Sequence, residues 1–334
     1  MLRVTFVGWA ITLGAIAVLL ALDWAALGRR PHEVRLGEAA RWSVFYVLVS
    51  VLFGVAFSLV SGWDLGAQYL TGYVVEESLS VDNLFVFLII IGSFAVPAAQ
   101  RAKVLTIGIV VALALRAVFI ALGAALLDLF SFVFLIFGVT LLGTAVQLFR
   151  NRQEDPDVGD NALVNLARRV LPMSTGYDGP KILTRERGRQ VLTPLFLALL
   201  AIGSTDLLFA FDSIPAVFGV TDHAYIVFAA NAFALLGLRP MFFLVSGLLD
   251  RLVYMGTGLA IVLGFIGIKL ILEFAHRVDH QVPELSTATS LAVILIVLAI
   301  MVVASVIESR RDTNVRAHAG SLRRRPRVKE EEDD

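Results

Sequence analysis

Residues 76–87 carry a dense group of oxygen-bearing side chains inside a long apolar stretch. The segment reads EESLSVDNLFVF and contains Glu76, Ser80, Asp82 and Asn83. Carboxylate, hydroxyl and amide oxygens are the ligands that Mn²⁺, Mg²⁺ and Ca²⁺ prefer. An ionised side chain at the centre of a bilayer costs roughly 2.5–3.5 kcal/mol, so such groups persist where they face a cavity, pair with opposite charge or bind an ion. The segment therefore predicts a cation site.

A second segment, residues 206–215, has related chemistry and reads DLLFAFDSIP. Asp206 and Asp212 are six residues apart, the spacing of the two acids Glu76 and Asp82 in the first segment. The proline that ends the segment lacks an N–H, so it leaves a backbone carbonyl one turn earlier without its helical donor. This carbonyl is a further candidate oxygen ligand.

The two segments together predict one shared site. Its predicted metal ligands are Glu76, Ser80, Asp82, Asn83, Asp206, Asp212 and Ser213, and its predicted charge-balancing residues are Arg116, Arg239 and Lys269. Four acids against three bases leave one negative charge, so a divalent cation and protons could alternate on the carboxylates. We expect two layers, with Asp82 and Asp206 nearer the cytoplasm and Glu76 and Asp212 nearer the exterior. Three other interpretations stay open: a purely structural ion-pair network, polar side chains that only bond neighbouring helices, and basic side chains that extend to the membrane surface.

The composition of the chain indicates what positions these side chains. It is 58% hydrophobic and 17% charged, with a mean hydropathy of +0.82, which predicts an all-α polytopic membrane protein. Apolar runs long enough for a membrane-spanning helix lie near residues 4–23, 42–62, 65–95, 104–126, 129–149, 191–219, 224–249, 254–274 and 288–308. The absence of cysteine excludes disulfides, thiolate metal sites and cysteine nucleophiles.

The distribution of Lys and Arg predicts the orientation. Nine spans place most of the 28 basic residues on one side, in the loops 24–41, 96–103 and 150–190 and in the C-terminal tail. Basic loops collect on the cytoplasmic side. We therefore expect a multi-pass protein of the plasma membrane with its N-terminus outside and its C-terminus in the cytoplasm.

The chain also resembles itself. The pattern of Ser80, Asp82 and Leu84 recurs at Ser204, Asp206 and Leu208, and Arg116 and Arg239 follow the two aspartates at nearly equal distances. Since each unit holds three spans, the second must enter the membrane from the opposite side, which is typical of secondary transporters. The predicted parts are residues 1–64 with peripheral spans one and two, 65–149 with the first repeat, 150–190 as a cytoplasmic loop, 191–274 with the inverted second repeat, 275–309 with an outer loop and span nine, and 310–334 as a disordered cytoplasmic tail.

The polar segments have simpler interpretations. The central loop contains Leu163, Leu166 and Val170 next to Arg168 and Arg169, which predicts either a short amphipathic helix or a solvated linker. We expect it to be the surface for any cytoplasmic protein partner. No nucleotide-binding loop or nucleophile motif occurs, so we expect neither an enzyme with catalytic residues, nor a prosthetic group, nor nucleic-acid binding.

The two polar segments also resemble the signature stretches of the TerC family, from Glu76 to Val86 and from Asp206 to Ala216. The resemblance implies nine spans, membrane acids at Glu76, Asp82, Asp206 and Asp212, and a role in manganese export, in a family named for tellurite resistance. Two positions depart from the pattern: Gly203 replaces an acid and Gln147 replaces a lysine, so the two changes cancel in charge.

The expected function is therefore export of a divalent cation, Mn²⁺ above others, by exchange with protons. The alternative is a membrane scaffold that does not transport and recruits partners in metal or tellurite stress or in membrane-protein assembly.

Overall fold

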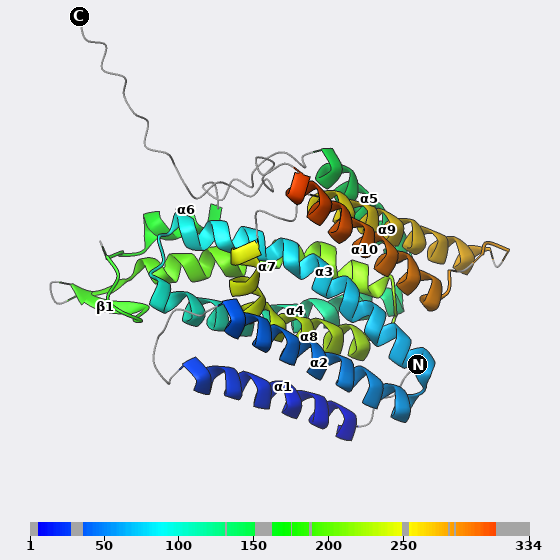
Figure 1. The fold of residues 1–334 in the computed structure, drawn as a ribbon, viewed down its shortest axis with the longest axis horizontal. Coiled ribbons are helices and arrows are strands. Elements are labelled where there is room, and N and C mark those ends of the chain that lie inside the picture. The colour runs from blue at the N-terminus through cyan, green and yellow to red at the C-terminus, as the bar shows by residue number, and fades with distance from the viewer. Residues whose placement is uncertain are drawn as a thin grey trace, which may run out of the picture.

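A computed structural model describes residues 6–27, 36–130, 132–150, 162–174, 176–186, 189–248, 254–279, 281–283 and 285–311. The protein is an all-α polytopic membrane protein with one short β-hairpin (Figure 1). The elements are α1 (Phe6–Leu27), α2 (Leu36–Ser61), α3 (Trp63–Ser93), α4 (Ala98–Leu129), α5 (Val133–Arg150), α6 (Ala162–Val170), β1 (Leu183–Glu186), β2 (Arg189–Leu192), α7 (Pro194–Phe218), α8 (Ala224–Leu248), α9 (Met255–Val278) and α10 (Thr287–Arg311). The predicted tail beyond residue 311 lies outside the described residues.

Eight of the described helices are long and apolar enough to cross a membrane: α1, α2, α4, α5, α7, α8, α9 and α10. The remaining predicted span, residues 65–95, corresponds to α3, which has 31 residues but carries Asp64, Glu76, Glu77 and Asp82. It packs against α2, α7, α8, α9 and α10, so its polar side chains lie among other helices. Helix α8 is the most enclosed of the eight, with 83% of its apolar window buried.

The helices of the two predicted repeats pack in corresponding pairs. Helix α3 contacts α7, α4 contacts α8, and α5 lies along α9. The start of α3 and the end of α7 line the same cleft, as do the start of α5 and the end of α9, so the members of these pairs run in opposite directions. An inverted repeat predicts this arrangement, and the repeat itself stays a prediction.

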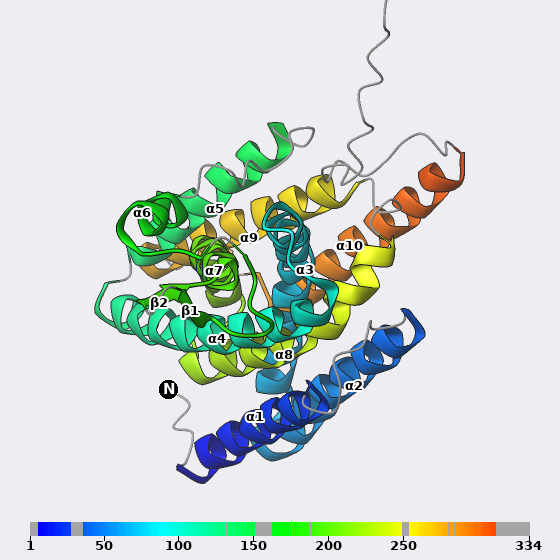
Figure 2. The ribbon, with the colours of Figure 1, turned by 90° about the vertical axis from the view of Figure 1, so that its left-hand side faces the viewer.

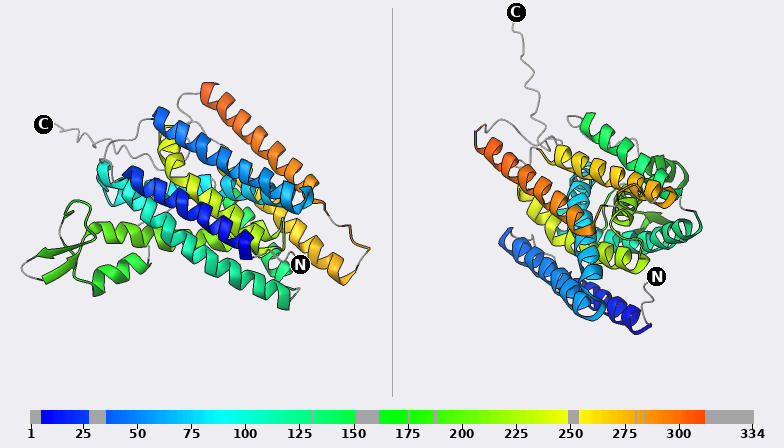
Figure 3. Two further views of the ribbon diagram at one scale, coloured as in Figure 1. Left: turned by 90° about the horizontal axis from the view of Figure 1, so that it is seen from below. Right: turned by 90° about the vertical axis from the view of Figure 1, so that its right-hand side faces the viewer.

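The peripheral helices lie on the outside of the core. In Figure 2, α7 lies among α3, α4 and α9, while α1 and α2 lie at the edge of the bundle. Helix α10 also lies on the outside (Figure 3), where Ile296 and Ile300 are exposed. Glycines allow the closest approach, because a Cβ added to Gly138 of α5 would lie 2.8 Å from the carbonyl oxygen of Gly267 in α9. Small residues let helix backbones approach in this way in membranes.

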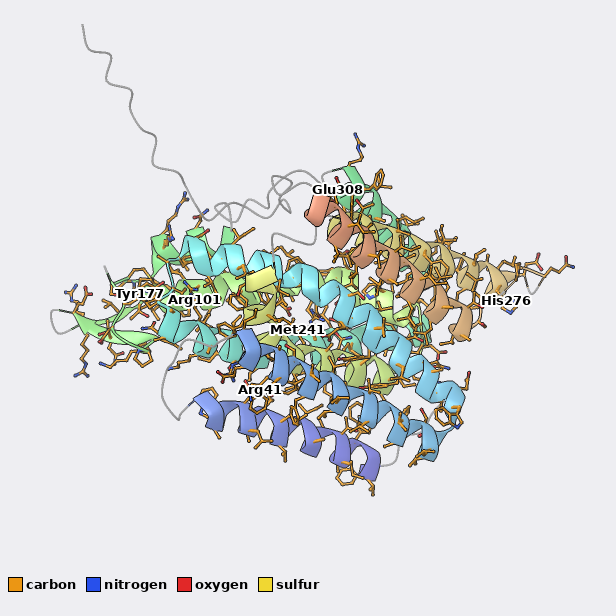
Figure 4. The ribbon with its side chains drawn as sticks, in the orientation of Figure 1. Arg41, Arg101, Tyr177, Met241, His276 and Glu308 are labelled. Carbon is orange, nitrogen blue, oxygen red and sulfur yellow. The ribbon has the colours of Figure 1, made fainter. Side chains whose placement is uncertain are left out.

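The central loop is folded where it is described. Strands β1 and β2 pair antiparallel, and α6 packs against α7, with Val164 and Ala167 of α6 buried. The hydroxyl of Tyr177 donates to the carbonyl oxygen of Phe94 at 2.6 Å, which fixes the loop to the end of α3. Tyr177 and Arg101 lie together at this end of the molecule, and His276 lies at the other (Figure 4). The described part of the loop is therefore more than a solvated linker.

Candidate functional site

The centre of the site is the guanidinium of Arg116, in the middle of α4. Its Nε and Nη2 donate to the two carboxylate oxygens of Asp206 at 3.3 and 3.2 Å, and its Nη1 donates to Glu76. The same Nη1 also donates to the Asn231 amide oxygen at 2.7 Å and to the Ser213 hydroxyl at 3.1 Å. All five side chains are at most 1% exposed. Four helices, α3, α4, α7 and α8, thus meet at one cation.

The charge of this group is unbalanced. Glu76 and Asp206 carry two negative charges when ionised, and Arg116 supplies one positive charge. Bidentate contacts between arginine and carboxylate are strong and fix the geometry of both partners. The group therefore has room for one more positive charge, from a proton or as part of a bound cation.

Glu76 also begins a polar face of α3. The Oε2 atom of Glu76, the hydroxyl of Ser80 and the amide nitrogen of Asn83 are buried without a hydrogen-bond partner among the described residues. The three residues are spaced i, i+4 and i+7, so they lie on one side of the helix and span about 10 Å along it. Buried polar atoms nearly always have a partner, so such a row points to an ion or water that binds there.

Asp212 lies apart from this centre. Its carboxylate accepts a hydrogen bond from the Thr144 hydroxyl of α5 at 2.9 Å, and its side chain is only partly buried. The expected outer pairing of Glu76 with Asp212 is therefore wrong, because Glu76 meets Asp206 through Arg116 instead. The side chain of Asp82 lies outside the description, so the pairing expected for it stays a prediction.

The other two predicted charge-balancing residues lie elsewhere. Arg239 of α8 pairs with Asp23 of α1, whose other carboxylate oxygen accepts from the Thr106 hydroxyl at 3.1 Å. Lys269 is 7% exposed and lines a cleft between the ends of α3, α7 and α9. Of the three basic residues, Arg116 alone touches the two acids described at the centre.

Glu77 turns away from the site, toward α8. A Cβ added to Gly237 of α8 would lie 3.8 Å from its Oε1 atom, whereas its neighbour Glu76 faces Arg116. Both oxygens of Glu77 are buried without a hydrogen-bond partner among the described residues.

Sequence reasoning missed two members of these networks, Asn231 and Asp23. The signal for Asn231 was an amide in the middle of an apolar span, where a polar group needs a partner. Asp23 gave a weaker signal, since it lies near the end of a span that was expected to be peripheral.

The described residues contain no ready-made group of three His, Cys, Asp or Glu side chains arranged around a metal. Glu76 and Asp206 are held by Arg116, so a cation could bind both carboxylates only after the guanidinium moves. The metal-ligand assignments stay predictions.

Comparison with known proteins identifies the family of the chain. Residues 61–313 match the family of integral membrane proteins called TerC, a range that contains the whole Arg116 network. The chain belongs to the TerC family. No solved structure matches this TerC protein.

Similar proteins cover most of its length. The uncharacterized membrane protein Rv2723 of Mycobacterium tuberculosis is 44% identical over 327 residues, which is 93% of this TerC chain and 82% of the relative. An uncharacterized membrane protein of Myxococcus xanthus is 42% identical over 305 residues, covering 90% of this chain and 92% of that protein. The putative membrane-bound redox modulator Alx of Escherichia coli K12 is 39% identical over 275 residues, covering 78% and 84%.

Proposed function

We propose that this TerC protein is a secondary transporter, without enzymatic activity, that exports a divalent cation from the cytoplasm in exchange for protons, with Mn²⁺ as the first candidate. The cation binds Glu76 and Asp206, with Ser80, Asn83 and Ser213 as additional oxygen ligands. Asp82 and Asp212 serve the same path in other stages of transport.

The row of unpartnered polar atoms on α3 carries this proposal. A buried polar group without a partner costs about 1–3 kcal/mol, so three on one helical face would strongly destabilise an element that had only a structural role. They begin at a carboxylate of the Arg116 centre and continue toward the end of α3 that Tyr177 fixes. A partly dehydrated cation that moves along this face would supply the missing partners.

Arg116 gives the exchange its charge balance. When the guanidinium binds Glu76 and Asp206, one further proton makes the group neutral. When Arg116 withdraws, one divalent cation neutralises the same two carboxylates. The two carboxylates therefore keep a compensating positive charge in both states, in a medium where uncompensated charge is unfavourable, and the withdrawn guanidinium takes another counter-ion in the second state. Cation release is therefore coupled to the return of Arg116 and the uptake of one proton.

The packing of the helices supports alternating access. The corresponding helices α3 and α7 lie side by side in opposite directions, with one carboxylate of the centre on each. Transporters built from inverted repeats bind their substrate at such an interface. In this proposal the protein lies in the plasma membrane, with the folded central loop in the cytoplasm and the N-terminus outside, as the basic loops predict.

Mn²⁺ uptake into everted vesicles tests the proposal. We expect a pH gradient to drive uptake, and we expect Glu76→Gln, Asp82→Asn and Asp206→Asn to reduce it at least tenfold. Glu186→Gln makes the same kind of change on an exposed strand and should leave uptake within twofold of wild type. Equal uptake by all variants at matched protein levels would overturn the proposal, and parallel assays with Ca²⁺ and Mg²⁺ identify the preferred ion.

The scaffold alternative is favoured by one observation. Helix α6 packs against α7 with one face and leaves Leu163, Leu166 and Val170 on the other, each at least 48% exposed. Replacing these three residues with serine should abolish function in cells if the loop recruits partners, and should spare cation transport. The name of the relative Alx suggests a redox role, but this chain has no cysteine for thiol–disulfide chemistry.

A further inference from the structure

A cleft opens at the end of the bundle away from the β-hairpin. It has a volume of about 380 Å³ and is lined by the first turns of α3, the last residues of α7 and α9 and the start of α10. Asp64, Asp222 and Glu273 contribute carboxylates to its wall, and Lys269 and Arg277 contribute positive charges. Arg277 contacts Glu273 at 3.3 Å and Asp222 at 3.9 Å, so its charge is largely satisfied within the wall.

The floor of the cleft lies close to the Arg116 centre. Phe218, the last residue of α7, lines the cleft and is 2% exposed. Ser213 is five residues earlier on the same helix, about 8 Å along its axis, and accepts a hydrogen bond from Arg116. The last turn of α7 therefore separates the cleft from the centre.

Three glycines let neighbouring helices seal this turn. A Cβ added to Gly72 of α3 would lie 3.1 Å from Val217, and one added to Gly123 of α4 would lie 3.1 Å from the Phe218 ring. A Cβ on Gly219 would lie 2.6 Å from Ile266 of α9. The turn is thus in close contact with α3, α4 and α9.

The turn is joined to the rest of α7 by a weakened helix. Pro215 lies inside α7 and has no N–H to donate to the carbonyl of Phe211. A proline within a helix is a common position for a kink. Beyond it, the Thr221 hydroxyl donates to the Gln68 side chain at 2.6 Å, which fixes the end of the turn to α3.

We propose that the cleft is the outer vestibule through which a divalent cation leaves, and that residues 216–219 form its gate, with Phe218 as the plug. Movement about Pro215 withdraws the Phe218 ring from Gly123 and joins the vestibule to the Arg116 centre. The acids of the wall then receive the cation. The inference rests on the proposed export function for its cargo, but the gate is a property of access that can be measured without transport.

The absence of cysteine allows a direct test with one introduced thiol. Ser213→Cys places a nearly isosteric reporter below the gate, and its reaction with a charged, membrane-impermeant methanethiosulfonate is followed in right-side-out and everted vesicles. We expect slow labelling in the parent. Phe218→Ala should raise the labelling rate at least tenfold from the vestibule side only.

Phe211→Ala is the matched control, because it removes the same ring from α7 at a site that is 53% exposed and does not line the cleft. It should leave the rate within twofold of the parent. If Phe218→Ala does not fold, Phe218→Leu should still raise the rate at least threefold over Phe211→Leu. Equal rates in the Phe218 and Phe211 variants, or an increase only from the side of the β-hairpin, would overturn the gate. Gated labelling of the Ser213→Cys variants, together with no Mn²⁺ transport by the wild-type protein, would instead keep the gate and reject the proposed export.

Discussion

Replacing Arg116 with methionine should be among the most damaging single changes in the described part of the chain. The side chain is fully buried and donates to four partners, two of which are carboxylates. Removing one partner of a buried ion pair costs about 3–5 kcal/mol, because the remaining charge stays buried without compensation. At roughly 2 °C per kcal/mol for a large domain, the midpoint of thermal unfolding should fall by about 6–10 °C.

Intrinsic tryptophan fluorescence of the purified protein in detergent measures this change. Arg277→Met is the control, because that arginine is 38% exposed and its surface ion pairs contribute about 0–1 kcal/mol, with a further contact to the Phe134 ring. Its midpoint should move by less than about 2 °C. Adding Glu76→Gln to Arg116→Met should recover part of the loss, because one buried charge disappears with the other.

The same variant separates a transport site from a structural ion pair. Without Arg116, the two carboxylates Glu76 and Asp206 are free to bind a divalent cation, so Mn²⁺ should raise the unfolding midpoint of Arg116→Met by more than that of wild type. The triple variant that also carries Glu76→Gln and Asp206→Asn should not respond. If Arg116→Met unfolds at the same temperature as Arg277→Met, the Arg116 network does not make the large contribution to stability that its burial implies. If Mn²⁺ has no greater effect on Arg116→Met than on the triple variant, the carboxylates are not a cation site.

Three further predictions concern the frame around the site. Gly138→Val should destabilise the protein by about 1–3 kcal/mol, because its side chain would meet a carbonyl oxygen of α9, whereas Gly143→Ala meets nothing within 4 Å and should be neutral or slightly stabilising in thermal unfolding. Tyr177→Phe should lower the free energy of unfolding by about 1 kcal/mol and make the central loop more susceptible to limited proteolysis. Hydrogen bonds from Thr184 and from a nearby lysine hold the pKa of Asp178 below its ordinary 3.8, so their contribution is complete above that value and is lost as the pH falls through the lowered pKa. The protection of the hairpin amides from hydrogen exchange should therefore be the same at pH 7 and pH 5 and should fall only below about pH 4. In Thr184→Val, the part of this fall that depends on Asp178 should be absent.

The sequence predicted the elements better than their side-chain partners. Long apolar runs define the helices because each must satisfy its own backbone in lipid, and the repeated motifs identified α3 and α7 as the site helices. The layers were assigned from depth alone. Six residues turn a helix through about 600°, so Asp206 and Asp212 diverge by about 120° and cannot both face Arg116 easily. The prediction used the depth of each acid in the membrane but not the side of the helix on which it lies, so it paired Glu76 with Asp212 instead of Asp206.

The folded part of the central loop also could not be read from hydropathy. Its strands are four residues each, and its attachment depends on single hydrogen bonds such as that from Tyr177 to Phe94. Such short polar contacts leave no periodic pattern. The partner of Arg239 was missed for a similar reason, since Asp23 is more than 200 residues away in the sequence.

The two arginines at corresponding positions of the predicted repeats have different partners. Arg116 meets one carboxylate from each site helix, whereas Arg239 meets Asp23, which belongs to α1 and lies outside the repeat. Helix α1 is also joined to α8 at its other end, where Thr12 and Tyr225 share a hydrogen bond of 2.6 Å. Helix α1 is thus fixed to α8 at two places and supplies a counter-ion for Arg239. In the proposed exchange, only Arg116 would compete with a cation for the carboxylates of the centre, so the exchange would take place at one centre instead of two.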